Sequence, residues 1–508
     1  MKKWILACVL VALGIALLCL NISAVSMSAG GVCGPNAYWK FEEETGTLTI
    51  YGQGVVRQRP WYSSVEQTHH LVKHVVVEEG ITELESYSFA DCINLETVQL
   101  PQSLEVIGGS VFQGCSGLTQ IELKENVQIL GRDAFASCHN LERISLGGSL
   151  QKIGTCCFFA CLKLQSISLP DTLTHIGQQA FLSCSSLEQV YIGAGVCDID
   201  EDAFAGCDAL MRFTVSSNNQ VFKDLDGVLF TDDETVLVEY PNARAGEYAI
   251  PNSVVRIGEK AFYDCDGLIA VTIPGTVREI GANAFGSCSA LAQIHMEEGV
   301  ETIGFSAFSC EILRQITIPA SVTRVEDQAL DCSSLEQVIF LGDKPFLGED
   351  LWHVDFMAFY PAGNPTWEGT YEQLNGKILW KEACAGEHVV IVDPAVSANC
   401  LQTGMTKGAH CANCGMIMQF RDRIDMTDHT YGPWQTIREP SLDSTGWEER
   451  SCGVCGKIES RVLPLMEPVE EQNEKSGWGV VILVAGGALA GGLIGWRTWQ
   501  EEKRRKRL

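Results

Sequence analysis

The sequence has 508 residues, of which 46% are hydrophobic and 20% are charged, a composition typical of folded globular proteins. Its formal net charge is -28 at pH 7, and so acidic a chain repels the phosphates of nucleic acids and of anionic lipids. Nucleic acid binding is therefore disfavoured, and the length indicates several structural parts.

The first residues form a targeting pattern. A basic start, Met1 to Lys3, precedes an apolar run from Trp4 to Leu20 and small residues through Ala29. This order is typical of a secretory signal peptide, so we expect residues 1–29 to direct export. The segment 30–79 then follows without repeating, and its TLTIYG stretch alternates as a strand does.

Residues 80–343 contain ten copies of a sequence repeat of about 23 residues, with an insertion at 216–249. A fixed period of this size is the signature of a solenoid, in which stacked repeats bury one another's apolar faces. Alternation predicts one strand in each copy, and a second short strand ends in Ile-Gly. The AFxxC segment is expected to be a tight turn or a single helical turn that places its phenylalanine in the core. These core positions are Phe89, Phe112, Phe135, Phe158, Phe181, Phe204, Phe262, Phe285 and Phe308.

A solenoid exposes its core at both ends, so the flanking segments are expected to be caps. The N-terminal cap is residues 30–79. The C-terminal cap is residues 344–381, where the period fades and prolines and glycines predict turns.

One cysteine recurs in every copy, from Cys92 to Cys332, among 22 in the chain. Equivalent positions of stacked coils form a ladder, so each thiol is expected to act as a small buried hydrophobic group. A rung spacing of about 4.8 Å also lies within the Cα range of a disulfide. We favour free thiols and leave the oxidation state open.

The repeat can be written IGxxAFxxCxxLxxIxIP, present as IGEKAFYDCDGLIAVTIP ending at Pro274 and nearly so as IGTCCFFACLKLQSISLP ending at Pro170. It resembles the BspA-like leucine-rich repeats of bacterial surface proteins over about residues 33–380. The resemblance implies a right-handed, mainly β solenoid outside a bacterial cell. It also implies attachment to proteins of a host or of neighbouring cells.

The insertion carries a second resemblance. Asp224 to Gly227 reads DLDG, which is similar to the nucleophile motif of haloacid-dehalogenase-type phosphatases. That chemistry requires the aspartates at the end of a parallel strand, whereas this motif lies in a predicted hairpin between solenoid coils. No Gly-x-Ser-x-Gly, HExxH or phosphate-binding glycine loop occurs in a supporting context. We therefore expect no enzymatic activity.

Two small cysteine-rich modules follow, at 382–424 and 425–464. Each contains CxxCG, a knuckle that can present two thiolates to a tetrahedral metal. In the first module this predicts a structural zinc site, with disulfides that could recruit Cys384 as the alternative. The candidate ligands are His388, Cys400, Cys411 and Cys414.

The second module is a degenerate copy of the first. It offers His429, Cys452 and Cys455, and Leu442 stands where the first copy has Cys400. We therefore expect it to lack a fourth metal ligand.

After an acidic linker at 465–477, residues 478–496 form an uncharged run bounded by tryptophans. Its 19 residues span about 28 Å as a helix, enough to cross a bilayer, and the basic tail 497–508 is expected to stay in the cytoplasm. Gly487, Gly491 and Gly495 have a spacing that permits helix dimerisation.

These parts predict a non-enzymatic protein anchored in a bacterial cell membrane, which presents its solenoid outside the cell to bind a protein. The outward strand positions are the candidate binding face: Arg143, Gln189, Tyr191, Arg212, Gln293, His295, Gln315 and Gln337. The alternative is a carbohydrate or cell-wall binding module that uses Trp61, Trp367 and Trp434 as stacking platforms.

Overall fold

The computed structural model describes residues 29–62, 68–348, 355–369 and 378–466. The chain divides into two compact units, Met1–Ala385 and Gly386–Leu508. Residues 1–28 of the predicted signal peptide, the predicted membrane segment 478–496 and the basic tail lie outside the described residues. Among the described residues, no helix is both long enough and apolar enough to cross a membrane.

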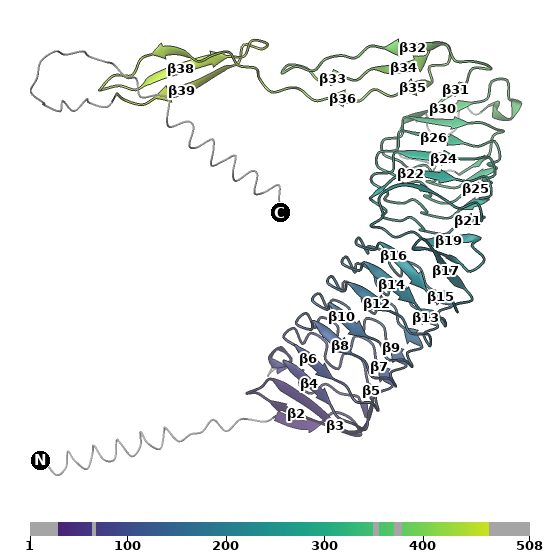
Figure 1. Cartoon of the computed structure of the whole chain (residues 1–508), viewed down its shortest axis with the longest axis vertical. Helices are drawn as coiled ribbons and strands as arrows, with labels where there is room; N and C mark the ends of the chain where they lie inside the picture. The colour runs from purple at the N-terminus through teal and green to yellow at the C-terminus, as the bar shows by residue number, and fades with distance from the viewer. Residues whose placement is uncertain (1–28, 63–67, 349–354, 370–377, 467–508) are drawn as a thin grey trace, which may run out of the picture. The chain divides into compact units, whose positions relative to one another are not determined.

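The first unit is a β-solenoid of about 14 turns with nearly no helix (Figure 1). Its described residues contain two 3-10 turns, η1 (Thr68–Leu71) and η2 (Pro365–Trp367). The AFxxC segments are turns, which decides between the two conformations expected for them.

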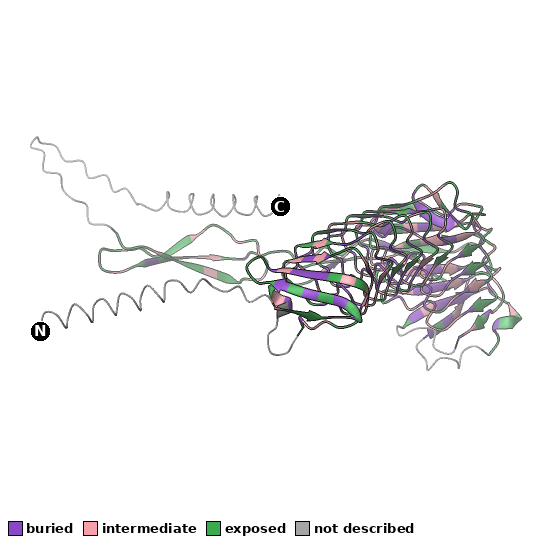
Figure 2. Cartoon of the chain, turned by 90° about the horizontal axis from the view of Figure 1, so that it is seen from below, coloured by how far each residue is buried: buried purple, intermediate pink, exposed green. Residues whose placement is uncertain are grey.

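The N-terminal end is an antiparallel sheet of β1 (Ala29–Val32), β2 (Asn36–Glu42) and β3 (Thr47–Val56). Strict alternation of buried and exposed residues along β2 places one face on the core (Figure 2). Strand β3 contains the predicted TLTIYG strand and pairs in parallel with β4 (His74–Val77) and β5 (Ile81–Leu84), where the repeats begin.

Each repeat contributes one strand to each of two parallel ladders. Partners on neighbouring strands are one repeat apart, as in the pairing of Ile167 with Val190. The Ile-Gly ladder comprises β7 (Val106–Ile107), β9 (Ile129–Leu130), β11 (Lys152–Ile153), β13 (His175–Ile176), β15 (Asp198–Ile199), β21 (Arg256–Ile257), β23 (Glu279–Ile280), β25 (Thr302–Ile303), β27 (Arg324–Val325) and β29 (Phe346–Leu347).

The second ladder carries the longer strands, whose alternate side chains face outward. It comprises β6 (Thr97–Gln99), β8 (Gln120–Glu122), β10 (Arg143–Ser145), β12 (Ser166–Ser168), β14 (Gln189–Ile192), β16 (Arg212–Val215), β20 (Gly246–Ala249), β22 (Leu268–Ile273), β24 (Gln293–Met296), β26 (Gln315–Ile318), β28 (Gln337–Phe340), β30 (Phe356–Tyr360) and β31 (Ile378–Glu382).

The repeated phenylalanines form a stacked row through the interior. All nine are buried, and consecutive rings from Phe89 to Phe204 have centroids 5.1 to 5.5 Å apart. The row resumes from Phe262 to Phe308 with spacings of 4.6 and 5.2 Å. Offset stacking at these distances is favourable in addition to the burial of ring area.

The cysteine ladder lies beside the ring row as free thiols. The Cys138 thiol donates to the carbonyl oxygen of Phe112 at 3.1 Å, and Cys161 and Cys184 make the same contact one and two repeats later. Burial raises the pKa of Cys138 to about 12, so the thiol stays protonated and unreactive. The ladder thus also supplies a donor to a core carbonyl.

The Ile-Gly positions bring neighbouring coils into backbone contact. A Cβ on Gly154 would lie 2.7 Å from the backbone N of Arg132 and 2.7 Å from the carbonyl carbon of Gly131. Glycine is therefore required here by close approach.

Gly154→Ala is expected to destabilise the repeat unit by about 1–3 kcal/mol, because the added methyl forces two coils apart. Chemical denaturation followed by circular dichroism measures the effect. Gly148→Ala is the matched control, since its Cβ would meet the carboxylate end of Glu125, which can move. Equal midpoints for the two variants would contradict the close-approach explanation.

The insertion breaks the stack into two cores. Strands β17 (Phe222–Leu225), β18 (Val228–Thr231) and β19 (Val236–Glu239) form antiparallel pairs, and β19 then pairs in parallel with β21. One buried cluster runs from Cys33 to Leu229 and the other from Val228 to Trp380. The ion pair of Lys260 with Asp202, at 2.6 Å, spans the interruption.

The second unit contains short antiparallel sheets. They are built from β32 (Val390–Asp393), β33 (Gly404–Met405), β34 (Gly408–Cys411), β35 (Ile417–Gln419), β36 (Arg423–Ile424), β37 (Gln435–Arg438), β38 (Gly446–Ser451) and β39 (Ile458–Leu463). Neither of the two hydrophobic clusters of the described residues extends into this unit.

Candidate functional site

Most of the predicted binding face points outward from the second ladder. Six residues are exposed: Arg143, Gln189, Tyr191, Arg212, Gln293 and His295. Gln315 is half-buried. Register brings some of them together, because Gln189 pairs with Arg212 and Tyr191 with Thr214 on the adjacent strand.

Gln337 does not belong to this exposed face. It is fully buried, and its side-chain amide donates to the side-chain oxygen of Gln315. Strand β28 lies between β26 and β30, and two aligned amides satisfy each other within the protein. The prediction that Gln337 faces a partner is therefore wrong.

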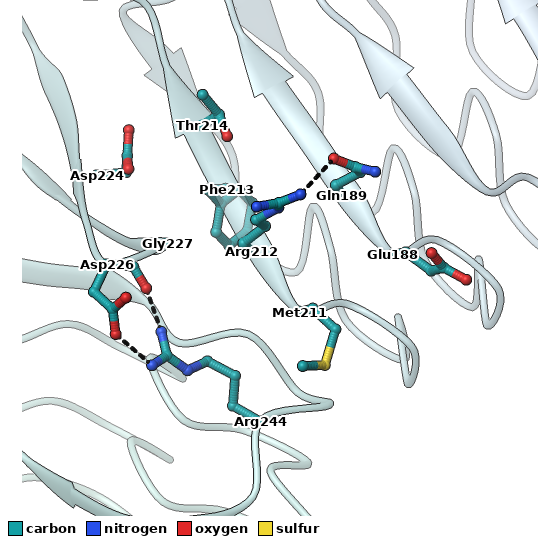
Figure 3. Close-up of a pocket in the computed structure, with 10 residues that line it drawn as sticks. All are labelled: Glu188, Gln189, Met211, Arg212, Phe213, Thr214, Asp224, Asp226, Gly227 and Arg244. Atoms are coloured by element: carbon teal, nitrogen blue, oxygen red, sulfur yellow. Dashed lines mark hydrogen bonds and ion pairs between the residues drawn. The ribbon is translucent and has the colours of Figure 1, made fainter.

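An open pocket of about 610 Å³ lies where the strand face meets the insertion. Figure 3 shows its lining, in which Arg212 reaches toward Gln189 and Arg244 toward Asp226. Its lining residues are Glu188, Gln189, Met211, Arg212, Phe213, Thr214, Asp224, Asp226, Gly227 and Arg244. Of these, Gln189 and Arg212 were predicted for binding. The insertion residues Asp224, Asp226, Gly227 and Arg244 were not, because the repeat pattern says nothing about the insertion.

Ion pairing and backbone contacts fix the insertion side of the pocket. Arg244 Nη2 lies 2.7 Å from Asp226 Oδ2, and its other terminal nitrogen donates to the backbone oxygen of Asp226. Asp224 Oδ1 accepts a hydrogen bond from the backbone N of Val215 at 2.8 Å. The pocket therefore presents both signs of charge beside the exposed strand edge.

The DLDG segment is a hairpin turn. Asp226 and Gly227 have φ values of 49 and 81°, and they connect β17 to β18 in an antiparallel pair. Two positive φ angles in a two-residue loop are typical of the tight turns that join such strands. The motif thus lies where the insertion was expected to place it, away from the end of a parallel strand.

Two of the three tryptophans proposed as sugar platforms are buried at the ends of the ring row. Trp61 and Trp367 are each 1% exposed. Trp61 stacks on Phe89, and Trp367 packs against Phe340. Neither can offer a free ring face to a sugar, because both complete the core. Trp434 is half-buried, with Arg450 and Arg461 over its ring.

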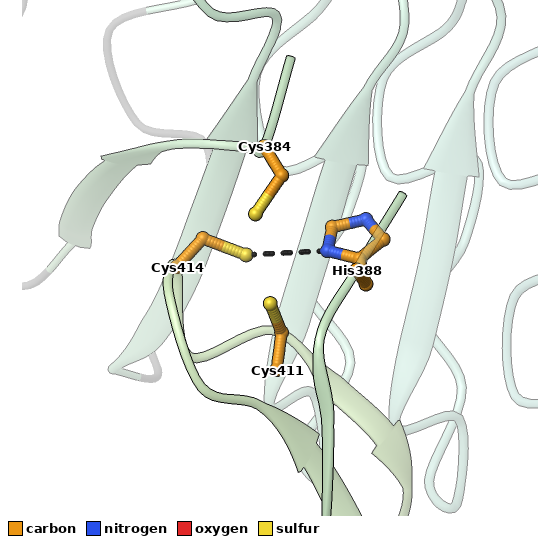
Figure 4. Close-up of side chains that lie close together, drawn as sticks. All are labelled: Cys384, His388, Cys411 and Cys414. Carbon is orange, nitrogen blue, oxygen red and sulfur yellow. Dashed lines mark hydrogen bonds between the residues drawn. The ribbon is translucent and has the colours of Figure 1, made fainter. Parts of the chain in front are cut away.

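The cysteine-rich segments contain two groups of four side chains that could hold a metal. We define the first cluster as Cys384, His388, Cys411 and Cys414 (Figure 4), and the shared cluster as Cys400, His429, Cys452 and Cys455. Within each cluster the ligand atoms all lie within 4.8 Å of one another.

These clusters differ from the predicted ligand set in the positions of two cysteines. His388, Cys411 and Cys414 are brought together as predicted, but Cys384 stands in the place expected for Cys400. Cys400 instead supplies the fourth position that the second module was expected to lack. Sequence alignment of the two copies could not reveal the exchange, because it matches equivalent positions and says nothing about contacts between one module and the other.

The two knuckles share one geometry. The backbone N of Gly415 donates to the oxygen of Cys411 at 2.9 Å, and that of Gly456 to Cys452 at 2.9 Å. Both glycines have positive φ, 81 and 74°, which lets the chain turn back. Backbone donors, first that of Cys455, lower the pKa of the Cys452 thiol, whereas burial and then the neighbouring thiols of Cys452 and Cys455 raise the pKa of Cys400.

Stacked short parallel strands around a buried row of leucine and phenylalanine define a leucine-rich repeat protein. The family model described as a BspA type leucine-rich repeat region matches residues 68–153, 111–225 and 240–353, which together make up more than half of the chain. The chain belongs to this family. A search of curated proteins finds no match.

Several solved structures are similar. A leucine-rich cell surface protein from Faecalibacterium prausnitzii A2-165 has 26% identity and a TM-score of 0.49, over 63% of this chain and 90% of that one. The pneumococcal vaccine antigen PcpA has 15% identity and a TM-score of 0.47, over 70% of this chain and 98% of that one. A leucine-rich repeat protein from Bacteroides ovatus has 18% identity and a TM-score of 0.44, over 69% and 99%.

Proposed function

We propose that this leucine-rich repeat protein is a non-enzymatic bacterial cell-surface protein that binds another protein through the strand face around β14 and β16. The observation that carries the proposal is the pocket at the insertion, which adjoins exposed side chains of types enriched in protein interfaces. Tyr191 is 38% and Met211 is 52% exposed, and Arg212 lies beside them. Tyrosine, methionine and arginine are enriched in protein interfaces relative to other surfaces.

The charges of the pocket also favour a protein partner. Arg212 and Arg244 lie beside Glu188, Asp224 and Asp226. A surface that carries both signs complements the mixed charges of another protein surface, whereas a polyanion would meet repulsion from the carboxylates.

The double change Tyr191→Ala and Arg212→Ala is expected to weaken attachment to host or bacterial cells about tenfold or more, since truncation of central Tyr and Arg residues is typically costly. Beads carrying the purified protein, counted on cells by flow cytometry, measure the attachment. The unfolding midpoint should stay unchanged, because both side chains are exposed.

Gln151→Ala with Lys152→Ala is the matched control, because these exposed residues lie at β11 of the Ile-Gly ladder, outside the predicted binding face. This control should retain attachment. Equal attachment by the wild type and by the Tyr191 and Arg212 variant would show that the face around β14 and β16 does not bind the partner.

We also propose that the protein is anchored in the bacterial cell membrane with both described units outside. The support is the order of parts in the sequence, an export signal first and an apolar run with a basic tail last. Protease added to intact cells should remove the repeats and leave a fragment that contains the tail.

For the first cluster we propose a structural zinc ion. The Sγ of Cys414 lies 3.5 Å from Nδ1 of His388, close to the edge of about 3.6 Å expected for sulfur and nitrogen bound to one tetrahedral zinc. Three thiolates and one imidazole make a closed set, which suits a structural ion.

A further inference from the structure

The shared cluster draws its side chains from both cysteine-rich modules. Cys400 belongs to the first module, and His429, Cys452 and Cys455 belong to the second. The Sγ atoms of Cys400 and Cys452 are 3.7 Å apart, and Cys455 Sγ lies 3.2 Å from His429 Nδ1. Residues 52 positions apart in the sequence thus converge on one point.

Local backbone contacts hold each contributor in place. Asn399 Oδ1 accepts hydrogen bonds from the backbone N of Leu401 and of Gln402, at 2.8 and 3.1 Å, which fixes the turn that carries Cys400. The backbone N of Gly453 donates to the oxygen of Thr430, and Tyr431 forms an isolated β-bridge with Cys452, so the segment that carries His429 stays beside the second knuckle. The four side chains therefore converge from backbone that is already constrained.

The spacing fits a tetrahedral metal better than a disulfide. Zinc–sulfur bonds of about 2.3 Å give a sulfur–sulfur edge of about 3.8 Å, close to the 3.7 Å between Cys400 and Cys452. A disulfide requires the two sulfurs to approach to about 2.05 Å, and it leaves the imidazole without a role. Thiolate and imidazole ligands select zinc over calcium or magnesium, which prefer oxygen.

The described part of the second unit, residues 386–466, also lacks the apolar core that would hold it without a metal. Among its described residues only four apolar side chains are buried, namely Ala409, Cys411, Met416 and Cys452, and two of these are cluster ligands. Its strand β32 exposes Val390, Ile391 and Val392 by about half. Small domains with so little buried area are usually stabilised by metals or disulfides.

We propose that Cys400, His429, Cys452 and Cys455 bind a second structural zinc ion, which joins the two modules into one folded body. The set is closed, with four protein ligands, so it leaves no position for a substrate. Because one ligand comes from the first module, binding of the ion fixes the two modules relative to each other. This inference does not depend on which partner the repeats bind.

The test is the zinc content of the full chain, expressed with export, purified in detergent without reductant and measured by elemental analysis. The wild type should hold two zinc ions, one for each cluster. Cys400→Ala should hold one zinc ion, because it loses a ligand of the shared cluster. Cys414→Ala should also hold one, because it loses a ligand of the first cluster. Cys197→Ala, which removes an exposed thiol of the repeats, should retain both. A wild-type content in Cys400→Ala, or a wild type without zinc and with these thiols oxidised, overturns the proposal.

A second measurement needs no variant and covers the case in which Cys400→Ala fails to fold. Removal of zinc from the wild type by a chelator should make the connection between the modules, near residues 424–428, at least tenfold more sensitive to limited proteolysis. Added zinc should restore the protection. Cleavage at the same rate with and without zinc contradicts a metal that joins the modules.

Discussion

Phe158→Ala is expected to lower the free energy of unfolding of the repeat unit by about 3–5 kcal/mol, as is typical when a buried aromatic ring is truncated. Phe158 is fully buried, with the rings of Phe135 and Phe181 at 5.4 and 5.1 Å and nearly parallel. Its removal leaves a gap against both neighbours. Since each coil contacts only the next, the gap weakens the coupling between the halves of the first stack.

The neighbouring residue provides a matched control. Phe159 carries the same ring but is 36% exposed, so Phe159→Ala should cost well under half as much. Guanidine denaturation with circular dichroism measures both variants. Similar losses for the two would mean that the stacked row is not what holds the repeats together.

The repeat period allowed the ring row to be predicted residue by residue. A period fixes which positions are equivalent, and stacking then places equivalent positions side by side, as the buried row from Phe89 to Phe204 confirms. The inward and outward alternation of the long strands followed from the same argument, apart from Gln337. There, a contact with a neighbouring amide decided the environment, and periodicity contains no information about such contacts.

Most of the other features that were missed involve residues outside the period. Arg244 lines the pocket from the insertion, for which the repeats offer no template. Cys400 lies with the candidate ligands of the second module, and Cys384 takes its predicted place in the first cluster. The sequence of one module contains no information about its contacts with the other. Trp61 and Trp367 are buried rather than free because a solenoid needs large apolar residues to cover its open ends.

The interruption of the stack also encloses the carboxyl group of a half-buried residue, Glu239. Glu239 ends β19 and lines a cavity of about 160 Å³ together with Asp202 and Lys260. Burial, and then the negative charge of Asp202, raises the pKa of Glu239 to about 8. At neutral pH the folded protein therefore keeps this carboxyl protonated, whereas the unfolded chain releases the proton.

This difference makes the stability of the repeat unit fall as pH rises. Below about 4.5, the ordinary pKa of the group, both states are protonated and Glu239 contributes no pH dependence. Between about 4.5 and about 8 the folded state binds more protons, so each unit of pH costs up to about 1.4 kcal/mol. Above about 8 both states are ionised, and the loss becomes constant.

Glu239→Gln is therefore expected to remove a destabilisation of about 2–4 kcal/mol that the wild type acquires between pH 5 and pH 8. Glutamine keeps the shape of the protonated acid without its proton equilibrium. Denaturation midpoints at several pH values measure the effect, and Glu201→Gln, which removes an exposed carboxylate from the same cavity wall, is the control. If wild type and Glu239→Gln lose stability in parallel from pH 5 to pH 8, Glu239 is ionised in the folded protein and does not cause the loss of stability.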